Sequence, residues 1–273
     1  MEKSKIRKPA VAGQFYPLSS QELKEQISAF IDKKAVPQDA IACMLPHAGY
    51  VYSGLVAGQT VSRIKIKDKI ILLGPNHTGY GAGFSIMTEG AWQTPLGEIK
   101  IDSALAKQLL NSSSHLEDDQ LAHQSEHSLE VELPFLQYFK DDFKIVPITI
   151  LSDDCEALKE AGKEIASAIK QAGIQGSTLI VASSDMTHYE PLAQAQKKDE
   201  EAIEAILELN EEKLMEKVRK LNITMCGYAP IITMLAAAKA LGATGGKLIK
   251  YQTSGEVTRD NDSVVGYAGI IIN

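Results

Sequence analysis

Histidine and aspartate side chains follow three of the most apolar short segments of the chain. His47 lies in LPHAGY, His77 lies in GPNHTG, and Asp185 and His188 both lie in SSDMTHY. Gly, Pro and Asn account for the turns at these points, but a turn needs no histidine. Imidazole and carboxylate groups bind transition metals and transfer protons near neutral pH. A lone loop histidine is usually structural, so the shared placement of these residues is what indicates a site.

Cys226 adds a thiol that a metal site could use. It precedes a glycine and an apolar helical pattern, and the N-terminus of a helix lowers the pKa of a nearby thiol and favours the thiolate. The alternative is a small buried side chain, which is what most free cysteines are. We prefer that interpretation for Cys43 and Cys155. Three widely spaced cysteines argue against a disulfide framework.

The segment HQSEHSLEVELPFLQYF contains two further histidines, His123 and His127. We expect them near the start of a helix that Ser125 caps. His127 and Glu130 are three residues apart and would then share one helix face. That spacing suits a metal site or an acid/base pair, and it equally suits an ordinary surface helix.

Two neutral imidazoles and one thiolate form a ligand set for zinc, ferrous iron or copper, and they leave positions open for water or substrate. His47, His77 and Cys226 are therefore the candidate metal ligands. His188 and His127 are candidates for proton transfer or substrate binding. The sequence contains no Gly-x-Ser-x-Gly elbow, no P-loop lysine and no dinucleotide-binding glycine pattern, so other catalytic motifs offer no better interpretation.

The elements that must position these residues alternate between strands and helices. Apolar runs of strand length cover residues 40–45, 69–74, 143–150, 178–183, 246–254 and 264–272. Helical patterns cover residues 19–35, 153–172, 191–209, 210–221 and 227–241. The segment FSIMTEGAWQTPLGEIKID reads as a β-ribbon inserted after the second strand. We therefore expect an α/β fold whose central, mostly parallel or mixed sheet is covered by helices on both faces, with ligands at the carboxyl ends of the strands.

Composition sets broad limits on the protein. With 273 residues, of which 44% are hydrophobic, we expect residues 1–273 to form a single domain. A net charge of −7 argues against nucleic acid as a partner, which would need a basic face. No apolar run approaches the roughly 20 residues of a membrane span. The first 17 residues contain no apolar core like that of a signal peptide, so we expect a cytoplasmic protein without a membrane partner.

Seven segments together resemble the Memo family and occur in the expected order along nearly the whole chain. They are KPAVAGQFYP, LPHAGYVYSG, GPNHTG, EHSLEVELPFL, SSDMTHY, MCGYAP and SVVGYA. The resemblance is to the microbial type of the family, which is often grouped with AMMECR1-like and radical-SAM proteins, and it implies such proteins as partners. It also implies a fold similar to that of the class III extradiol (LigB-like) dioxygenases, which are non-haem iron enzymes.

The resemblance implies roles for individual residues. His47 and His77 match the two histidine ligands of the dioxygenases, and Cys226 matches the third ligand position, where those enzymes have a carboxylate. His188 corresponds to their acid/base histidine, with Asp185 beside it. A thiolate is softer than a carboxylate and shifts the metal preference toward copper(I) or zinc, so dioxygenase activity does not follow from the fold alone.

Three functions remain open from the sequence. The first is a metal-dependent redox enzyme that uses iron(II) or copper(I), with zinc as the alternative, and acts on a small molecule. The second is a binding or signalling module that receives an anionic peptide or metabolite in the same pocket. The third is a protein that stores or delivers metal. The resemblance also has one local departure: Arg259, in VTRDND, stands where we expect a smaller residue.

Overall fold

The computed structural model describes residues 6–273. Within them the main sheet has nine strands, and the four at its centre run parallel. In spatial order these are β2 (Ala42–Leu45), β9 (Thr178–Ser183), β3 (Lys69–Pro75) and β8 (Lys144–Ile150). Nearly all of their residues are buried, because helices cover both faces of the sheet, and this is why the strands are unbroken apolar runs in the sequence.

Further strands extend the parallel centre on both sides, and all of their pairings are antiparallel except that of β7 with β4. On one side β12 (Val264–Ile272) pairs with β2, and β11 (Gly246–Thr253) and β10 (His188–Glu190) both pair with β12. On the other side β4 (Phe84–Ile86) pairs with β8, and β7 (Glu117–Asp118) pairs with β4. The sheet is therefore mixed, as the sequence predicts.

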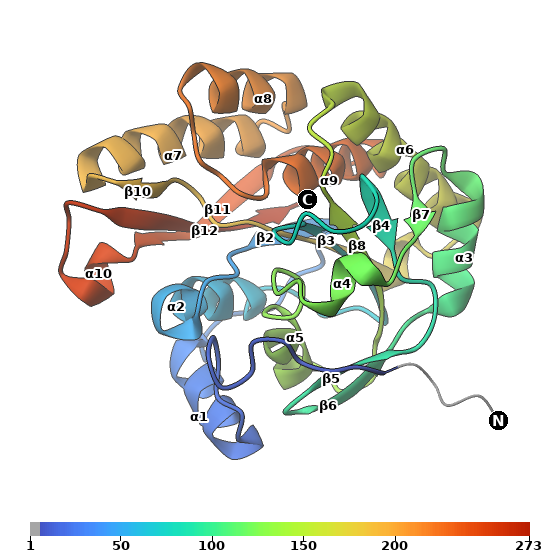
Figure 1. Cartoon of the computed structure of the whole chain (residues 1–273), viewed down its shortest axis with the longest axis horizontal. Coiled ribbons are helices and arrows are strands. Elements are labelled where there is room, and N and C mark those ends of the chain that lie inside the picture. Colours follow the sequence, from blue (N-terminus) through green and yellow to red (C-terminus); the bar gives the residue numbers. More distant parts are fainter. Residues whose placement is uncertain (1–5) are drawn as a thin grey trace.

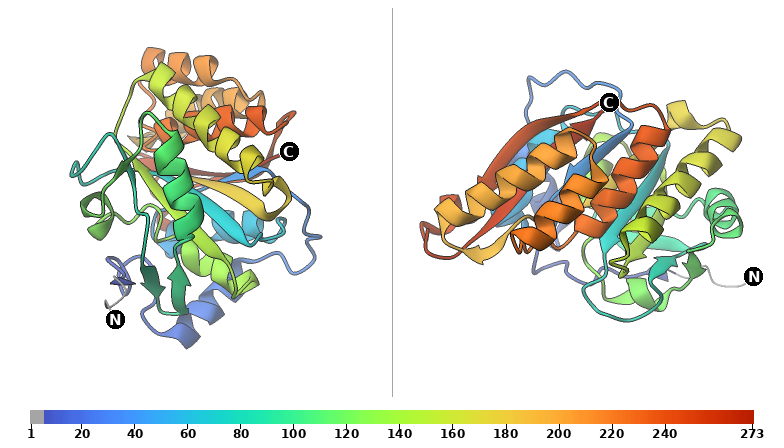
Figure 2. Two further views of the ribbon diagram at one scale, coloured as in Figure 1. Left: turned by 90° about the vertical axis from the view of Figure 1, so that its right-hand side faces the viewer. Right: turned by 90° about the horizontal axis from the view of Figure 1, so that it is seen from above.

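Four helices lie on one face of the sheet and run roughly side by side (Figures 1 and 2). They are α6 (Cys155–Gln171), α7 (Leu192–Leu207), α8 (Glu211–Lys220) and α9 (Tyr228–Ala240). Asn210 caps α8, since its side chain accepts a hydrogen bond from the backbone N–H of Lys213 at 2.9 Å. Helix α9 is buried along most of its length, as its uniformly apolar sequence predicts.

The opposite face carries α1 (Ser20–Phe30), α2 (Tyr50–Val61) and α5 (Leu133–Phe139) (Figure 1). Ser19 caps α1 through the backbone N–H of Glu22, but the helix ends at Phe30 rather than at residue 35. The sequence patterns did not predict α2. Its glycines lower helix propensity, yet a Cβ at Gly54 would lie only 2.4 Å from the Phe30 ring, so the glycine permits close packing of α1 on α2.

The predicted β-ribbon divides between two sheets. Strands β5 (Ala91–Thr94) and β6 (Gly97–Lys100) form an antiparallel hairpin, and β1 (Ile6–Arg7) pairs with β5 in a separate three-stranded sheet. The first residues of the expected ribbon instead form β4 of the main sheet, because all three are buried and pair with β8. The other elements are α3 (Ser103–Ser112), α4 (Leu121–Gln124), η1 (Gln175–Ser177) and α10 (Gly255–Thr258).

Residues 6–273 contain no candidate membrane-spanning helix. None of the helices there combines the length and the apolar character needed to cross a bilayer.

Candidate metal centre

The carboxyl ends of three parallel strands deliver His47, His77 and Asp185 to one edge of the sheet. These residues follow β2, β3 and β9, and they line a cavity of about 580 Å³ together with His127 and His188. Aromatic rings form part of its wall, namely those of Phe15, Tyr52, Tyr189 and Tyr267. The strand-end rule for α/β sheets therefore predicts the position of this cavity correctly.

His47 and His77, which line this cavity, converge with Cys226. Each offers one ligand atom, and the three atoms lie within 4.8 Å of one another. Cys226 Sγ is 3.3 Å from His47 Nε2, and the ring centroids of His47 and His77 are 5.2 Å apart. Nitrogen and sulfur atoms bound to one tetrahedral ion lie about 3.3–3.6 Å apart. Small side-chain rotations therefore separate this cluster from a metal-binding arrangement, and the donor set fits a transition metal.

Glu126 holds the His77 ring in place. Its Oε1 is 2.9 Å from His77 Nδ1, and its Oε2 accepts a hydrogen bond from the backbone N–H of His77. Oε1 also accepts from the backbone N–H groups of His127 and Ser128 at 2.9 Å each. Burial acts to raise the pKa of Glu126, but His77 and the Ser128 amide outweigh it and hold the pKa at about 2. Since Nδ1–H donates to this carboxylate, Nε2 of His77 is left free to bind a ligand.

His127 belongs to a turn and not to the helix that the sequence predicts. Helix α4 ends at Gln124 and α5 begins at Leu133, so Ser125 caps no helix that contains His127. His127 and Glu130 therefore do not share a helix face. The Glu130 carboxylate instead accepts hydrogen bonds from Arg7 and Tyr16 and from the backbone of the N-terminal segment.

The His127 ring nevertheless reaches the cluster. It stacks on His77 with 4.8 Å between centroids and an interplanar angle of 24°, and it makes edge contacts with His47 and Phe15. Burial, together with the neighbouring His77, lowers the pKa of His127, although Glu126 acts in the opposite direction. His127 is therefore neutral at neutral pH and can accept a hydrogen bond or a proton.

Asp185 connects two of the strand ends. Its Oδ1 accepts hydrogen bonds from the backbone N–H groups of His47 (2.9 Å) and Ala48 (3.3 Å), and its own N–H lies 3.3 Å from Cys226 Sγ. Burial raises the pKa of this carboxyl group to about 6, against the opposing influence of His188 and the two amides. Asp185 thus fixes the relative positions of the loops that carry His47 and Cys226.

His188 also lines the cavity, and its contacts fix which ring nitrogen carries the hydrogen. Its Nδ1 is 2.9 Å from the carbonyl oxygen of Thr224, which can only accept, so Nδ1 carries the hydrogen and Nε2 is free. The next residue, Tyr189, has a φ of 57° and a side chain that is mostly exposed at the cavity. Left-handed backbone is unusual for a bulky residue and often marks a functional position.

His47 is held by a buried group of hydrogen-bonding atoms. Its Nδ1 lies 2.8 Å from Ser183 Oγ. The same hydroxyl is 2.8 Å from the carbonyl oxygen of Ser128 and 2.8 Å from Oε1 of Glu132. All four residues are buried, so water does not compete for these contacts.

The match to known families covers almost the whole chain. Residues 7–271 match the family described as Memo-like protein. The chain belongs to the Memo family. A MEMO1 family protein from Methanopyrus kandleri is 42% identical over 97% of this chain and 98% of its own length. One from Methanococcoides burtonii is 44% identical over 98% and 100%, and one from Aquifex aeolicus is 43% identical over 98% and 99%.

The fold also occurs in a protein whose sequence is much less similar than those of these relatives. The crystal structure of an uncharacterized protein from Escherichia coli K12 superimposes with a TM-score of 0.55 and covers 84% of this Memo chain and 98% of that chain. The two share 14% sequence identity, so the likeness shows a common fold.

The thiol of this Memo protein behaves differently from the sequence-based expectation. Burial raises the pKa of Cys226, and the nearby Asp185 carboxyl group adds to the increase, so the helix N-terminus does not produce a free thiolate. The helix begins only at Tyr228, and the N–H of Gly227 donates to Ser184 Oγ at 2.9 Å rather than to the sulfur. A bound cation would supply the positive charge that deprotonates such a thiol.

Sequence reasoning missed three residues of the site: Glu126, Glu132 and Ser183. A glutamate is usually exposed, which is why these two attracted no attention. A signal was present for Glu132, because Glu130 and Glu132 alternate with apolar residues in EHSLEVELPFL. When an apolar segment is buried, acidic residues interspersed in it are buried as well. Buried acids need specific hydrogen-bond or ionic partners.

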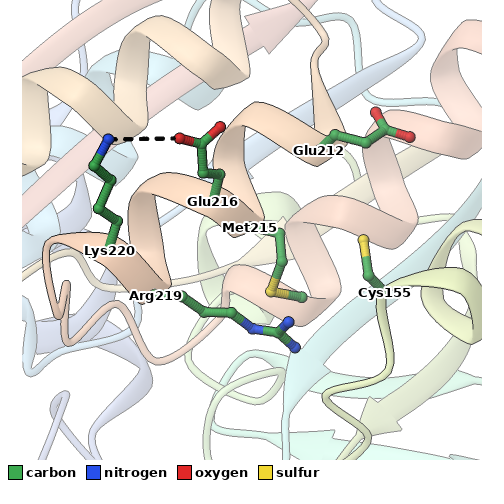
Figure 3. Close-up of a pocket in the computed structure, with 6 residues that line it drawn as sticks. All are labelled: Cys155, Glu212, Met215, Glu216, Arg219 and Lys220. Atoms are coloured by element: carbon green, nitrogen blue, oxygen red, sulfur yellow. Dashed lines mark ion pairs between the residues drawn. The ribbon is translucent and has the colours of Figure 1, made fainter.

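A second cavity, of about 570 Å³, lies between α6 and α8 (Figure 3). Cys155 faces it, but Glu212 and Glu216 form ion pairs with Lys159 and Lys220. No histidine is among the described residues that line it. Cys43 is fully buried in β2, as expected. Cys155 is only partly buried, which differs from the small buried side chain that we expected, although burial still raises the pKa of its thiol.

Proposed function

We propose that this Memo protein binds one transition-metal ion through His47, His77 and Cys226. The observation that carries the proposal is the convergence of three ligand atoms, from loops far apart in the sequence, within 4.8 Å of one another. Two imidazoles and a thiol suit iron(II) or copper(I), and they also suit zinc. His47 and His77 line the cavity, and Cys226 contacts His47. Coordination positions on a bound ion would therefore remain open to a small molecule in the cavity.

The outer contacts support this assignment. A metal-binding histidine usually donates its second ring N–H to a carboxylate or another acceptor. His77 has Glu126 in that place at 2.9 Å, and His47 has Ser183 at 2.8 Å. In both residues Nδ1 is occupied by this contact. Nε2 is therefore the ring nitrogen that remains available to a metal ion.

The proposed activity is a metal-dependent redox reaction on a small molecule in the cavity. When bound, the metal would supply Lewis acidity and electron transfer at the base of the cavity. His188 would accept a proton from the bound molecule at Nε2, since Nδ1 donates to Thr224. His127 would accept a hydrogen bond in its neutral form, and Asp185 would keep the loops of His47 and Cys226 in register.

A metal-free pocket for an anionic peptide or metabolite has less support. No lysine or arginine is among the described residues that line the cavity. Burial lowers the pKa values of His47 and His127, so these imidazoles carry no positive charge at neutral pH. The described residues of the cavity therefore offer an anion no lysine or arginine, and the imidazoles at His47 and His127 are neutral.

Metal binding by purified protein tests the proposal. Iron(II), copper(I) and zinc are each titrated anaerobically against a competing chelator, for the wild type and for Cys226→Ser and His77→Ala. We expect one ion per chain and a loss of at least about 10-fold in affinity in each variant. His115→Ala is the matched control, because that histidine pairs with Glu160 away from the cavity. Unchanged affinity in both cluster variants would end the metal hypothesis.

A further inference from the structure

Glu132 is a buried acid for which the proposed metal site provides no role. It precedes α5, its exposed fraction is 0%, and its Oε1 has Ser183 Oγ as a partner at 2.8 Å. Within residues 6–273, its Oε2 has no hydrogen-bond partner and its carboxyl group forms no ion pair. An ionised carboxylate without a cation is very costly in such surroundings. Burial accordingly raises the pKa of Glu132 well above its usual value, against the opposing influence of the Ser183 hydrogen bond, and Asp185 adds to the increase.

The Ser183 hydroxyl determines how the hydrogens are shared. It has one hydrogen to donate and two lone pairs to accept with, and it has three neighbours at 2.8 Å: the Ser128 carbonyl oxygen, Glu132 Oε1 and His47 Nδ1. The carbonyl oxygen of Ser128 can only accept. All three contacts are hydrogen bonds only if Ser183 donates to Ser128 and accepts from both Glu132 and His47.

We propose that Glu132 is a positioning residue that acts as a neutral acid and, through Ser183, fixes the tautomer of His47. The Glu132 O–H donates to Ser183, Ser183 donates to Ser128, and the remaining lone pair of Ser183 accepts the Nδ1–H of His47. His47 then presents a bare Nε2, the atom that lies 3.3 Å from Cys226 Sγ. Free neutral imidazole favours the opposite tautomer in water, so the Nδ1–H form has to be imposed by its surroundings.

The biological meaning of this tautomer rests on the proposed function, since a bare Nε2 is what a metal ion needs. The hydrogen-bond arrangement itself does not depend on a metal. A test on metal-free protein therefore separates the two proposals. If the tautomer responds as expected while the wild type binds no metal, only the metal hypothesis fails.

The substitution Glu132→Gln is the decisive variant. Glutamine has nearly the same size, and its amide N–H donates to Ser183 as the protonated acid does, but it cannot ionise. Glu132→Leu removes the donor and keeps an apolar side chain of similar size. Ser183→Ala removes the acceptor from His47 directly.

Histidine side-chain nitrogen chemical shifts, measured by ¹⁵N NMR on metal-free protein at neutral pH, report the tautomer of His47. The signal is assigned by its loss in His47→Gln. We expect the Nδ1–H form in the wild type and in Glu132→Gln, and mixed tautomers or the Nε2–H form in Glu132→Leu and Ser183→Ala. Zinc affinity should stay within about 3-fold of the wild type in Glu132→Gln and fall by about 10–100-fold in the other two variants.

Two results would overturn the proposal. The first is a Glu132→Gln variant in which the tautomer changes, which would mean that an ionised carboxylate is required. The second is an unchanged tautomer in both Glu132→Leu and Ser183→Ala, which would make Glu132 a packing residue only. Circular dichroism and thermal unfolding establish that each variant is folded. If Glu132→Leu does not fold, Glu132→Gln and Ser183→Ala decide the question between them.

Discussion

Glu126 and His77 are joined by two hydrogen bonds, one from the ring Nδ1–H to Oε1 at 2.9 Å and one from the backbone N–H to Oε2. One carboxylate therefore fixes both the position of the residue and the rotation of its ring. The carboxylate is fully buried and ionised, with a pKa of about 2. The geometry is that of a carboxylate orienting a histidine for a metal ion.

Replacing Glu126 with alanine should weaken metal binding without removing a ligand. The His77 ring would lose its orienting acceptor, and we expect the affinity for zinc or cobalt(II) to fall by about 10–100-fold. Competition with a chromophoric chelator measures this change. Glu160→Ala, which breaks the Glu160–His115 pair on the surface, is the control and should leave the affinity unchanged. Equal affinities for Glu126→Ala and the wild type would refute the orienting role.

Arg7 should be among the residues on which stability depends most. Its guanidinium pairs with Glu130, donates to the backbone oxygen of His123 at 3.0 Å, and lies 4.4 Å from the centre of the Trp92 ring. Arg7→Met leaves the buried Glu130 carboxylate without its cation. We expect the free energy of unfolding, measured in urea, to fall by about 3–5 kcal/mol.

A less buried ion pair provides the comparison for Arg7. Arg63 pairs with Asp32 at 2.7 Å, with about a third of each side chain exposed, so Arg63→Met should cost less than about 1 kcal/mol. The double variant Arg7→Met/Glu130→Gln should recover part of the stability lost in Arg7→Met. If Arg7→Met and Arg63→Met lower the free energy of unfolding by the same amount, the buried ion pair does not fix the N-terminal segment.

Much of the candidate site follows from rules that act on local sequence. Strands buried on both faces are continuous apolar runs, and their parallel carboxyl ends meet at one edge, so the neighbouring positions of His47, His77 and Asp185 could be predicted. Cys226 was a candidate because of its thiol and its place before a helix, and the family resemblance supported it. Nothing local in the sequence, however, places the start of α9 beside β9.

The contacts behind the histidines could not be predicted in the same way. Glu126 and Glu132 contact His77 and Ser183, which are distant from them in sequence. Their burial depends on how the segment between α4 and α5 packs against the ends of the strands. Helical periodicity placed His127 and Glu130 on one face, but that turn points them in different directions. Helix α2 was also not predicted, because glycine disfavours helices. Gly54 is nevertheless required there, since the Phe30 ring packs closely against it.

His123 should make stability depend on pH. Burial lowers its pKa to about 4, whereas in the unfolded chain it is about 6.5. Between these values the unfolded state binds the extra proton, so stability is full above about pH 6.5 and is lost as the pH falls toward 4. The loss from this residue is about 3 kcal/mol. His123→Gln should flatten the dependence of unfolding free energy on pH in this range, and an unchanged slope would contradict the assignment.

Arg259 should be replaceable with a gain in stability. It follows α10 as the C-terminal cap, with a left-handed φ of 62°, and it is exposed. Arg259→Gly removes the Cβ strain of the left-handed conformation, and the net gain should be about 0.5–1 kcal/mol after the greater freedom of the unfolded chain is counted. Arg259→Ala keeps the Cβ and should show no gain. A stabilisation of equal size in both variants would point to the charge instead.

The claim that His47, His77 and Cys226 share one ion is tested most directly by the absorption spectrum of the cobalt(II) protein. A sulfur-to-cobalt charge-transfer band should appear in the near ultraviolet and saturate at one ion per chain. Cys155→Ser should keep the band, whereas Cys226→Ser should lose it and His77→Ala should weaken cobalt binding. A wild-type protein without the band, or a Cys226→Ser variant that retains it at full intensity, would contradict the shared site.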